Sequence, residues 1–235
     1  MRAEQSDFLY NFAKIGKPVD RTEWGMTPPT VNAYYNPSMN EIVFPAGILQ
    51  PPFYDENADD AINYGGIGAV IGHEMTHGFD DQGRKFDAEG NLKDWWTDDD
   101  AKKYVERSSV IEKQFNDYVA IDSVHVNGKL TLGENTADLG GLTIAYAAFQ
   151  KAKAVNKKEE KIDGFTPEQR FFLSWAQVWR QNIRDEALRL RLNTDPHSPG
   201  RFRGMGPLTN MEECQKAFSI KDGSPMIRKE RAKIW

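Results

Sequence analysis

Apolar residues recur at steps of three and four in several stretches of this chain, which is the pattern of helices with one buried face. The pattern predicts helices over residues 64–81, 97 to about 120, and 133–151, and a fourth helix that begins at Thr166 and carries apolar residues to Ile183. Four glycines in the first stretch would each cost about 1 kcal/mol relative to alanine, unless neighbouring backbone packs closely there. They are Gly65, Gly66, Gly68 and Gly72.

A different pattern marks the start of the chain. Residues 31–35 and 41–44 are β-prone runs, and the segment Asn36-Pro37-Ser38-Met39-Asn40 between them favours a turn, so a β-hairpin is predicted. Residues 151–164 are charged and polar and predict a solvated connection, while residues 193–207, rich in Pro, Gly and Arg, predict irregular structure. The expected fold class is α+β and mostly helical, in one large domain or in one large domain with a small appendage.

Composition narrows the possible partners. The chain has 30 Lys and Arg against 35 Asp and Glu, a net charge of −5, and it lacks the basic stripe typical of nucleic-acid-binding proteins. No apolar run approaches the ~20 residues of a transmembrane helix, so no membrane span is expected. Cys214 is the only cysteine, which excludes an intrachain disulfide and weakly favours a bacterial or intracellular origin.

The segment His73-Glu74-Met75-Thr76-His77 carries the strongest chemical signal. Residues four apart on a helix project from one face with Cβ atoms about 5–6 Å apart, so both imidazoles can bind one zinc ion. Glu74 would lie beside the metal, where a carboxylate can take a proton from water. The pattern is only moderately specific, because two histidines on a polar face can also be exposed or paired with acids.

Carboxylates elsewhere in the chain can complete this site. A catalytic zinc needs three protein ligands and one open position, and Glu134 would supply the third ligand. Histidine ligands usually donate their second N–H to a carboxylate that fixes their orientation. Asp80, one turn after His77, and Asp138, one turn after Glu134, are placed for this role. The alternative for both is an ordinary surface acid.

His197 lies in a Pro- and Gly-rich segment together with Asp195 and Arg203. A histidine near zinc can donate a hydrogen bond to a developing oxyanion. From the residues alone, an ordinary loop histidine is the stronger interpretation of His197. We assign no role to His125.

Taken together, these motifs resemble the neprilysin and endothelin-converting-enzyme family of zinc endopeptidases, which includes bacterial oligopeptidase O. An ordered series of motifs is far more specific than His-Glu-x-x-His alone. The resembling segments are Val31-Asn32-Ala33-Tyr34-Tyr35, residues 41–52, residues 63–81, Asp94-Trp95-Trp96, residues 132–138, residues 176–179 and residues 197–203.

The resemblance implies a catalytic role for each candidate. One zinc ion would be bound by His73, His77 and Glu134, and Glu74 would activate water. Asp80 and Asp138 would orient the histidines. The remaining assignments are His197 as the oxyanion-stabilising histidine and Arg203 as the arginine that grips the substrate's backbone carbonyl or carboxylate.

The resemblance also implies how peptide substrates bind. Asn32 and Ala33 would pair with the backbone of the bound peptide, in agreement with a hairpin edge to which a strand can be added. Phe53, Val70 and Trp179 resemble residues that line the pocket for the side chain after the cleaved bond, which favours large apolar groups. Core packing is the competing explanation for these three.

At the level of the whole chain, the resemblance implies a thermolysin-like catalytic lobe over residues 1–235, with a small β-sheet at the edge of the cleft. The amino-terminal helical lobe of the family is expected to be absent from this chain and to act as its partner. A catalytically weak or inactive peptide-binding zinc domain is therefore the alternative function. An aminopeptidase lacks support, since no Gly-x-Met-Glu-Asn-like segment is found. A bacterial origin is favoured, and an extracytoplasmic location slightly over a cytoplasmic one.

Overall fold

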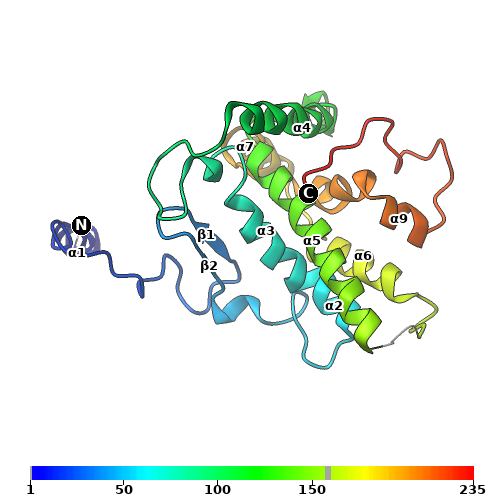
Figure 1. Ribbon diagram of the computed structural model, residues 1–235, viewed down its shortest axis with the longest axis horizontal. Helices are drawn as coiled ribbons and strands as arrows, with labels where there is room; N and C mark the ends of the chain where they lie inside the picture. Colours follow the sequence, from blue (N-terminus) through cyan, green and yellow to red (C-terminus); the bar gives the residue numbers. More distant parts are fainter. Residues whose placement is uncertain (1, 157–159) are drawn as a thin grey trace.

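The computed structural model describes residues 2–156 and 160–235 (Figure 1). Helices make up most of these residues, and the strands pair into two antiparallel hairpins, β1 with β2 and β3 with β4. In chain order the elements are α1 (Arg2–Phe12), β1 (Tyr34–Asn36), β2 (Glu41–Val43), η1 (Ala46–Ile48), α2 (Asp60–Asn63), η2 (Tyr64–Gly68), α3 (Ala69–His77), η3 (Gly83–Lys85), α4 (Asp98–Asn116), β3 (Val119–Ile121), β4 (Val124–His125), α5 (Leu132–Asn156), α6 (Pro167–Val178), α7 (Asp185–Thr194), α8 (Gly200–Met205), η4 (Pro207–Asn210) and α9 (Glu212–Ala217).

The predicted amino-terminal hairpin is confirmed. Tyr34 of β1 lies opposite Val43 of β2, and the predicted turn joins the two strands. The hairpin lies beside α3 (Figure 1), so the small sheet borders the helix that carries the His-Glu-x-x-His segment. The predicted α+β, mostly helical fold class is confirmed as well.

The first predicted helix begins earlier and ends earlier than residues 64–81. It begins at α2, where the side chain of Asp59 accepts a hydrogen bond from the backbone N–H of Ala61. It then passes through a π-helical segment, η2, and ends with α3 at His77. Asp80 therefore lies in a turn beyond the helix, from which its side chain reaches back to His77.

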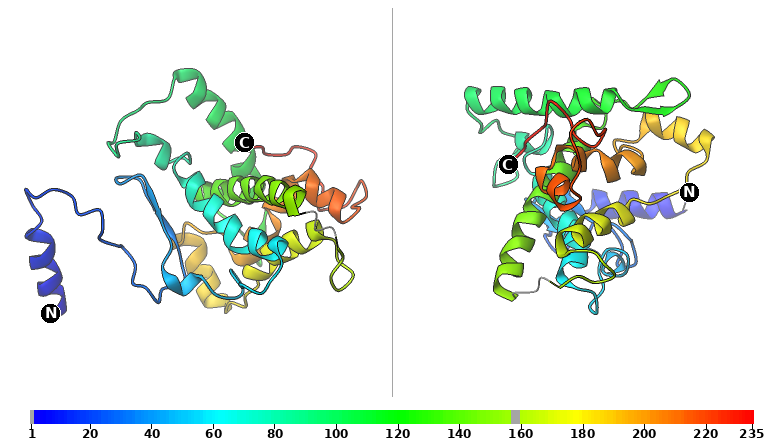
Figure 2. Two further views of the ribbon diagram at one scale, coloured as in Figure 1. Left: turned by 60° about the horizontal axis from the view of Figure 1, so that its bottom comes forward. Right: turned by 90° about the vertical axis from the view of Figure 1, so that its right-hand side faces the viewer.

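Helix α5 is the centre of the fold, and α3 packs against it more extensively than any other pair of described elements do. The two helices lie side by side in Figures 1 and 2. A Cβ atom at Gly72 of α3 would lie 2.5 Å from the carbonyl oxygen of Gly141 of α5. A Cβ atom at Gly141 would in turn meet the backbone nitrogen of His73. The backbones of the two helices thus touch next to a candidate metal ligand.

Close approach explains three of the four glycines in the first helical stretch. Gly65 and Gly66 face the backbone carbonyls of Phe171 and Phe53 as closely as Gly72 faces Gly141. Gly68 has no such close neighbour, because the nearest atom to a Cβ would be 3.4 Å away, so the ordinary cost of a helical glycine applies there.

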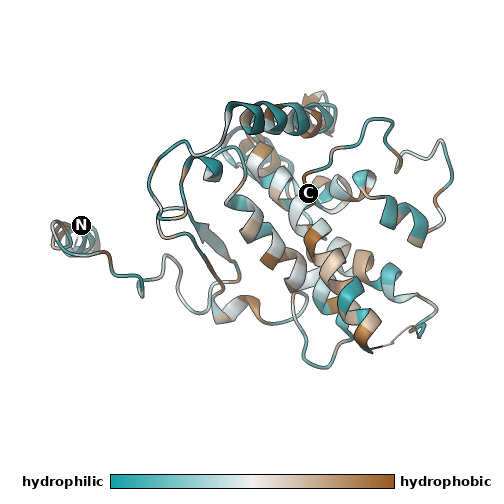
Figure 3. Cartoon of the chain, in the orientation of Figure 1, coloured by the Kyte–Doolittle hydropathy of each residue, from teal (hydrophilic) through white to brown (hydrophobic). Residues whose placement is uncertain are grey.

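The main core lies between α5 and α6. It is built from the apolar stripe of α5, including Leu142 and Phe149, and from Phe171, Phe172 and Trp175 of α6. A smaller cluster under the hairpin consists of Ala33, Ile48, Ile67 and Val70. In Figure 3 α4 differs from these helices, because most of its residues are hydrophilic.

Several predicted boundaries are wrong in the second half of the chain. Helix α4 ends at Asn116, because the chain turns into the β3–β4 hairpin (Figure 2). Helix α5 continues to Asn156, so only the later part of residues 151–164 is a connection, and residues 157–159 lie outside the described part of the chain. Helix α6 begins with the predicted capping box at Thr166 but ends at Val178, short of Ile183.

The predicted irregular segment 193–207 is also more regular than expected. Helix α7 extends through Thr194, α8 occupies Gly200–Met205, and η4 begins at Pro207. Only the short stretch between α7 and α8, which contains His197, is irregular. This segment is held by partners on α5 that lie more than sixty residues away in the sequence.

The amino-terminal helix takes no part in this core. Helix α1 buries none of its residues and lies apart from the other helices in Figure 1. Among the described residues, none of the helices combines the length and apolar character that crossing a membrane requires.

The contact between α3 and α5 can be tested with two alanine substitutions on one helical run. Gly72→Ala should lower the free energy of unfolding by about 2 kcal/mol, because overpacking at a helix contact costs about 1–3 kcal/mol. Gly68→Ala is the matched control and should be neutral or stabilising by up to about 1 kcal/mol. Urea unfolding of both variants measures the difference, and equal stabilities would contradict the proposed contact.

Candidate active site

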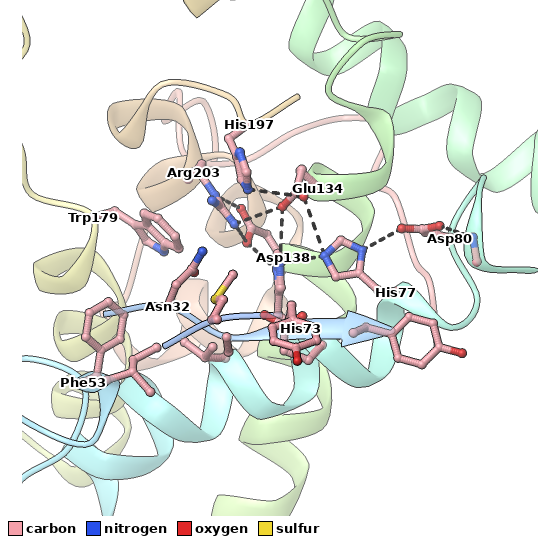
Figure 4. A pocket seen from close by; sticks show the side chains of 18 of the residues that line it. Asn32, Phe53, His73, His77, Asp80, Glu134, Asp138, Trp179, His197 and Arg203 are labelled. Carbon is pink, nitrogen blue, oxygen red and sulfur yellow. Dashed lines mark hydrogen bonds and ion pairs between the residues drawn. The ribbon is translucent and has the colours of Figure 1, made fainter. Parts of the chain in front are cut away.

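An open cleft of about 580 Å³ lies between the β1–β2 hairpin, α3, the start of α5 and the segment that leads into α8 (Figure 4). Every residue that the sequence nominated for the site lines this cleft: Asn32, Ala33, Phe53, Val70, His73, Glu74, His77, Asp80, Glu134, Asp138, Trp179, His197 and Arg203. The fold therefore gathers into one place residues that are up to 171 positions apart in the sequence.

Three side chains converge on one point at the floor of the cleft. The Nε2 atoms of His73 and His77 lie 3.0 Å apart. Glu134 places Oε2 at 3.3 Å from His73 Nε2 and Oε1 at 3.7 Å from His77 Nε2. Ligand atoms about 2.0–2.1 Å from a tetrahedral zinc ion are roughly 3.3 Å from one another. The three distances bracket this value, so these residues fit a zinc ion.

The hydrogen bonding and the ionisation of the Glu134 carboxylate also fit a metal ligand. Its Oε2 atom is buried and accepts no hydrogen bond from the described residues, although buried carboxylate oxygens normally have a partner. Burial alone would raise the pKa of Glu134, but contact with His73 and the charge of Arg203 hold that pKa well below its ordinary value. Glu134 is therefore a carboxylate with one oxygen left for a cation.

The two histidines differ in their surroundings. Burial disfavours a charge on His73, but the Asp138 and Glu134 carboxylates outweigh burial and raise the pKa of His73 to about 10. Since a metal ligand must be a neutral imidazole, binding a metal here requires release of that proton. His77 is more exposed at the edge of the cleft, and its Nδ1 atom lies 2.6 Å from Asp80 Oδ2.

Asp80 is held rigidly for this contact. Its Oδ1 atom accepts hydrogen bonds from the backbone N–H groups of Gln82 and Gly83, at 2.8 and 2.7 Å. Its Oδ2 atom is left to accept from His77 Nδ1. That bond fixes the tautomer in which His77 Nε2 carries no proton and faces the ligand point.

Asp138 is completely buried and joins two parts of the site. Its Oδ1 atom lies 2.9 Å from His73 Nδ1. Arg203 binds the same carboxylate through two hydrogen bonds, Nη2 to Oδ1 at 2.7 Å and Nε to Oδ2 at 2.8 Å. Burial favours the neutral acid, but the charges of Arg203 and His73 lower the pKa of Asp138.

Arg203 lies at the wall of the cleft rather than free within it. Its guanidinium carbon is 3.8 Å from the centroid of a Trp179 ring, a cation–π contact. The bonds to Asp138 use Nε and Nη2, and Nη2 also lies 3.5 Å from Glu134 Oε2. The expected role in substrate binding thus stays a prediction, beside an observed role as partner of Asp138.

Glu74 points into the same cleft and is buried. One of its carboxylate oxygens lies within 4.8 Å of the ligand nitrogens of His73 and His77. Burial raises the pKa of Glu74, and the charges of the two histidines oppose this rise. A carboxylate that takes up a proton more readily than usual is suited to act as a general base.

His197 faces Glu134 from the opposite side of the cleft, with Nε2 at 3.3 Å from Oε1 (Figure 4). Its Nδ1 atom lies 2.7 Å from Asp195 Oδ1, which also accepts the backbone N–H of His197. Asp195 is bound by Arg191 Nε at 2.7 Å. His197 is therefore oriented by its own segment, and its Nε2 atom is directed at the ligand point.

The remaining candidates line the cleft and also pack in the core. Ala33 and Val70 belong to the small cluster under the hairpin, and Phe53 packs against it. Trp179 packs against the main core. Phe53, Val70 and Trp179 thus pack in a core and also line the cleft, so core packing and a place in the cleft wall do not exclude each other. Trp175 also lines the cleft. Its position one turn before Trp179 could have predicted this.

The site also contains contacts that sequence reasoning missed. Asn135 and Ser198 form a buried hydrogen bond behind the cleft. No local signal pointed to either residue, because each finds its partner 63 positions away.

Comparison with known proteins agrees with this geometry. The model of peptidase family M13 matches residues 32–234. The chain belongs to peptidase family M13. The family resemblance inferred from the motifs is thereby confirmed.

Relatives within M13 show how much of a longer protein this chain represents. An endothelin-converting enzyme homologue of Locusta migratoria is 47% identical over 237 residues, which cover 100% of this chain and 32% of the relative. Neprilysin-3 of Drosophila melanogaster is 46% identical over 228 residues, which cover 96% of this chain and 29% of the relative. The chain thus spans about a third of the length of the curated relatives it matches.

A solved structure supports the fold. The zinc metalloprotease Zmp1 of Mycobacterium tuberculosis, determined in complex with an inhibitor, superposes with a TM-score of 0.93 at 49% identity. The superposition covers 97% of this chain and 36% of that chain. The chain therefore has the thermolysin-like fold of M13 zinc peptidases.

The contact of Asp80 with His77 predicts how a conservative change affects metal binding. In Asp80→Asn the amide oxygen should keep the backbone N–H groups, so that the amide N–H faces His77 Nδ1. His77 would then carry its proton on Nε2, and zinc affinity should fall about 10- to 100-fold. Competition with a chromogenic zinc chelator measures the affinity.

Asp81→Asn is the matched control for this test. It makes the same chemical change one residue away, and it should leave zinc affinity unchanged. Equal zinc affinities of the two variants would show that the Asp80 carboxylate does not set the orientation of His77.

Proposed function

We propose that this chain carries the active site of a zinc metalloendopeptidase that hydrolyses peptide bonds of oligopeptides. The observation that carries the proposal is the convergence of His73, His77 and Glu134 on one point of an open cleft, with Glu74 beside them. Membership of M13 and likeness to a solved zinc metalloprotease support it. Because the chain spans a third of its relatives, the activity of the whole protein is part of the proposal.

His73, His77 and Glu134 would hold the zinc ion, which when bound supplies Lewis-acid polarisation of water and of the peptide carbonyl. Glu74 then takes a proton from the attacking water, a role for which its buried position and raised pKa suit it. The same carboxyl group returns the proton to the amine that leaves. One side chain thus serves as base and as acid in successive steps.

His197 would stabilise the oxyanion that forms on the substrate carbonyl. The Asp195 carboxylate accepts from Nδ1 of His197, so a protonated ring directs its Nε2–H into the cleft. A fixed donor in a partly desolvated site stabilises developing charge more than water does, since it needs no reorganisation.

The substrate would bind as an extended strand along the edge of β1. The backbone at Asn32 and Ala33 precedes β1 and lines the cleft, where it can pair with a peptide. Phe53, Val70 and Trp179 would then contact the side chain after the cleaved bond. The bacterial origin and extracytoplasmic location remain predictions.

The assignment of Glu74 has a direct test. Glu74→Gln should retain one zinc ion per chain but lose about 10²–10⁴-fold in kcat on a fluorogenic oligopeptide, because this is the usual contribution of general-base catalysis. Glu106→Gln, on the exposed face of α4, is the matched control and should keep full activity. If Glu74→Gln cleaved the peptide as fast as the control, the proposed mechanism would be wrong. If the unaltered chain bound the peptide tightly without cleaving it, the chain would be a peptide-binding domain.

The apolar wall of the cleft predicts a sequence preference. In a peptide series that varies only the residue after the cleaved bond, kcat/KM should be about 10- to 100-fold higher for Phe or Leu than for Gly. Burial of such a side chain contributes about 1.5–3 kcal/mol. Mass spectrometry of the products locates the cleaved bond. Equal kcat/KM values across the series would show that Phe53, Val70 and Trp179 pack in the core and do not select the substrate.

A further inference from the structure

His197 contacts one of the candidate metal ligands directly. In this structure His197 Nε2 lies 3.3 Å from Glu134 Oε1. The Glu134 carboxylate also faces the ligand point, so His197 and a metal ion share it. A further attachment of the segment between α7 and α8 to α5 would hold the histidine independently of the metal.

A buried hydrogen bond provides that attachment. Ser198, the residue after His197, donates its hydroxyl proton to Oδ1 of Asn135, the residue after Glu134, at 2.8 Å. Both side chains are 1% exposed. Two consecutive residues of the segment thus face two consecutive residues of α5, one pair in the cleft and one pair behind it.

The direction of this bond follows from its neighbours. The Asn135 Nδ2 group donates to Thr131 Oγ1 at 2.8 Å, and the Thr131 hydroxyl donates to the backbone carbonyl of Asn127 at 3.0 Å. This chain of donors directs the Asn135 carbonyl oxygen toward Ser198. An amide oxygen only accepts, so the Ser198 hydroxyl must be the donor.

A second attachment lies further along the same segment. Arg203 binds Asp138, one turn after Glu134 on α5. Arg203 follows His197 by six residues, whereas Ser198 is adjacent to it. Of the two attachments, the one at Ser198 acts directly beside the backbone that carries the histidine.

We infer that the Ser198–Asn135 hydrogen bond positions His197 for oxyanion stabilisation, with Ser198 and Asn135 as positioning residues that touch neither substrate nor metal. The inference rests on the proposed function of His197. A displacement of a catalytic group by about 1 Å can cost on the order of 100-fold in rate, so loss of this bond should lower kcat and leave KM nearly unchanged.

The test compares Ser198→Thr with Ser198→Val in the full chain loaded with zinc. The two side chains have the same shape and differ only in the hydroxyl group. We expect the Val variant to have a kcat at least about tenfold below that of the Thr variant, with equal zinc affinity and equal melting temperature. Thr143→Val, which removes a hydroxyl that bonds within α5, is the matched control and should not change kcat.

A double-mutant cycle separates positioning of His197 from a structural role. In a His197→Ala background the Thr and Val variants should have equal residual kcat, because the residue that the bond positions is gone. Equal kcat of the two variants with His197 present, or an undiminished difference without it, would overturn the inference. If the added bulk unfolds both variants, Ser198→Ala against the unaltered chain makes the same comparison.

Hydrogen exchange gives a readout that needs no activity. Backbone amides of residues 195–199 should exchange faster in Ser198→Val than in Ser198→Thr, while amides of α4 should not differ. Unchanged exchange would show that the bond does not anchor the segment. Failure of the proposed function gives a different result. The unaltered chain would then cleave no peptide, whereas hydrogen exchange would still show whether the Ser198–Asn135 bond holds the segment.

Discussion

The close contact between α3 and α5 is the constraint on which the site depends. Two metal ligands stand on α3 and the third on α5, so their distances follow from the spacing of the two helices. Gly72 and Gly141 let the backbones touch next to His73. In a well-formed metal site the distances from metal to ligand lie within about 0.2 Å of their usual values. Side chains at this contact would separate the ligands, which explains glycines in helices where each costs about 1 kcal/mol.

The second organising feature is a balance of buried charge. Glu134 and Asp138 are carboxylates in a desolvated site, where the charge of Arg203 compensates them and where they raise the pKa of His73. Asp138 is central because it contacts Arg203 and His73 at once. Removing one member of a buried ion network leaves another charge without a partner, which costs several kcal/mol. Arg203 therefore contributes to the orientation of His73 through Asp138, in addition to any contact with substrate.

The sequence predicted what local signals encode and missed what distant contacts impose. The capping box at Thr166 and the four-residue spacing of His73 and His77 act within one helical turn, and the structure contains both. The segment 193–207 was predicted to be irregular because Pro, Gly and Arg dominate it. Its order comes from Ser198 and Arg203, whose partners lie on α5. For the same reason, no local pattern could show that the chain packs closely at Gly72 but not at Gly68.

Helix α5 shows how one element serves both fold and site. Beyond its first two turns it presents apolar residues such as Leu142 and Phe149 to the core. Its first two turns instead bury polar side chains, and three of these are directed to different components of the site: Glu134 to the ligand point, Asn135 to the His197 segment and Asp138 to Arg203. The amino-terminal end of a helix carries a partial positive charge that stabilises carboxylates there. Glu134 lies in the first turn of α5, where the backbone can offset part of its desolvation. The apolar remainder of the helix packs in the core and so fixes the position of this end beside α3.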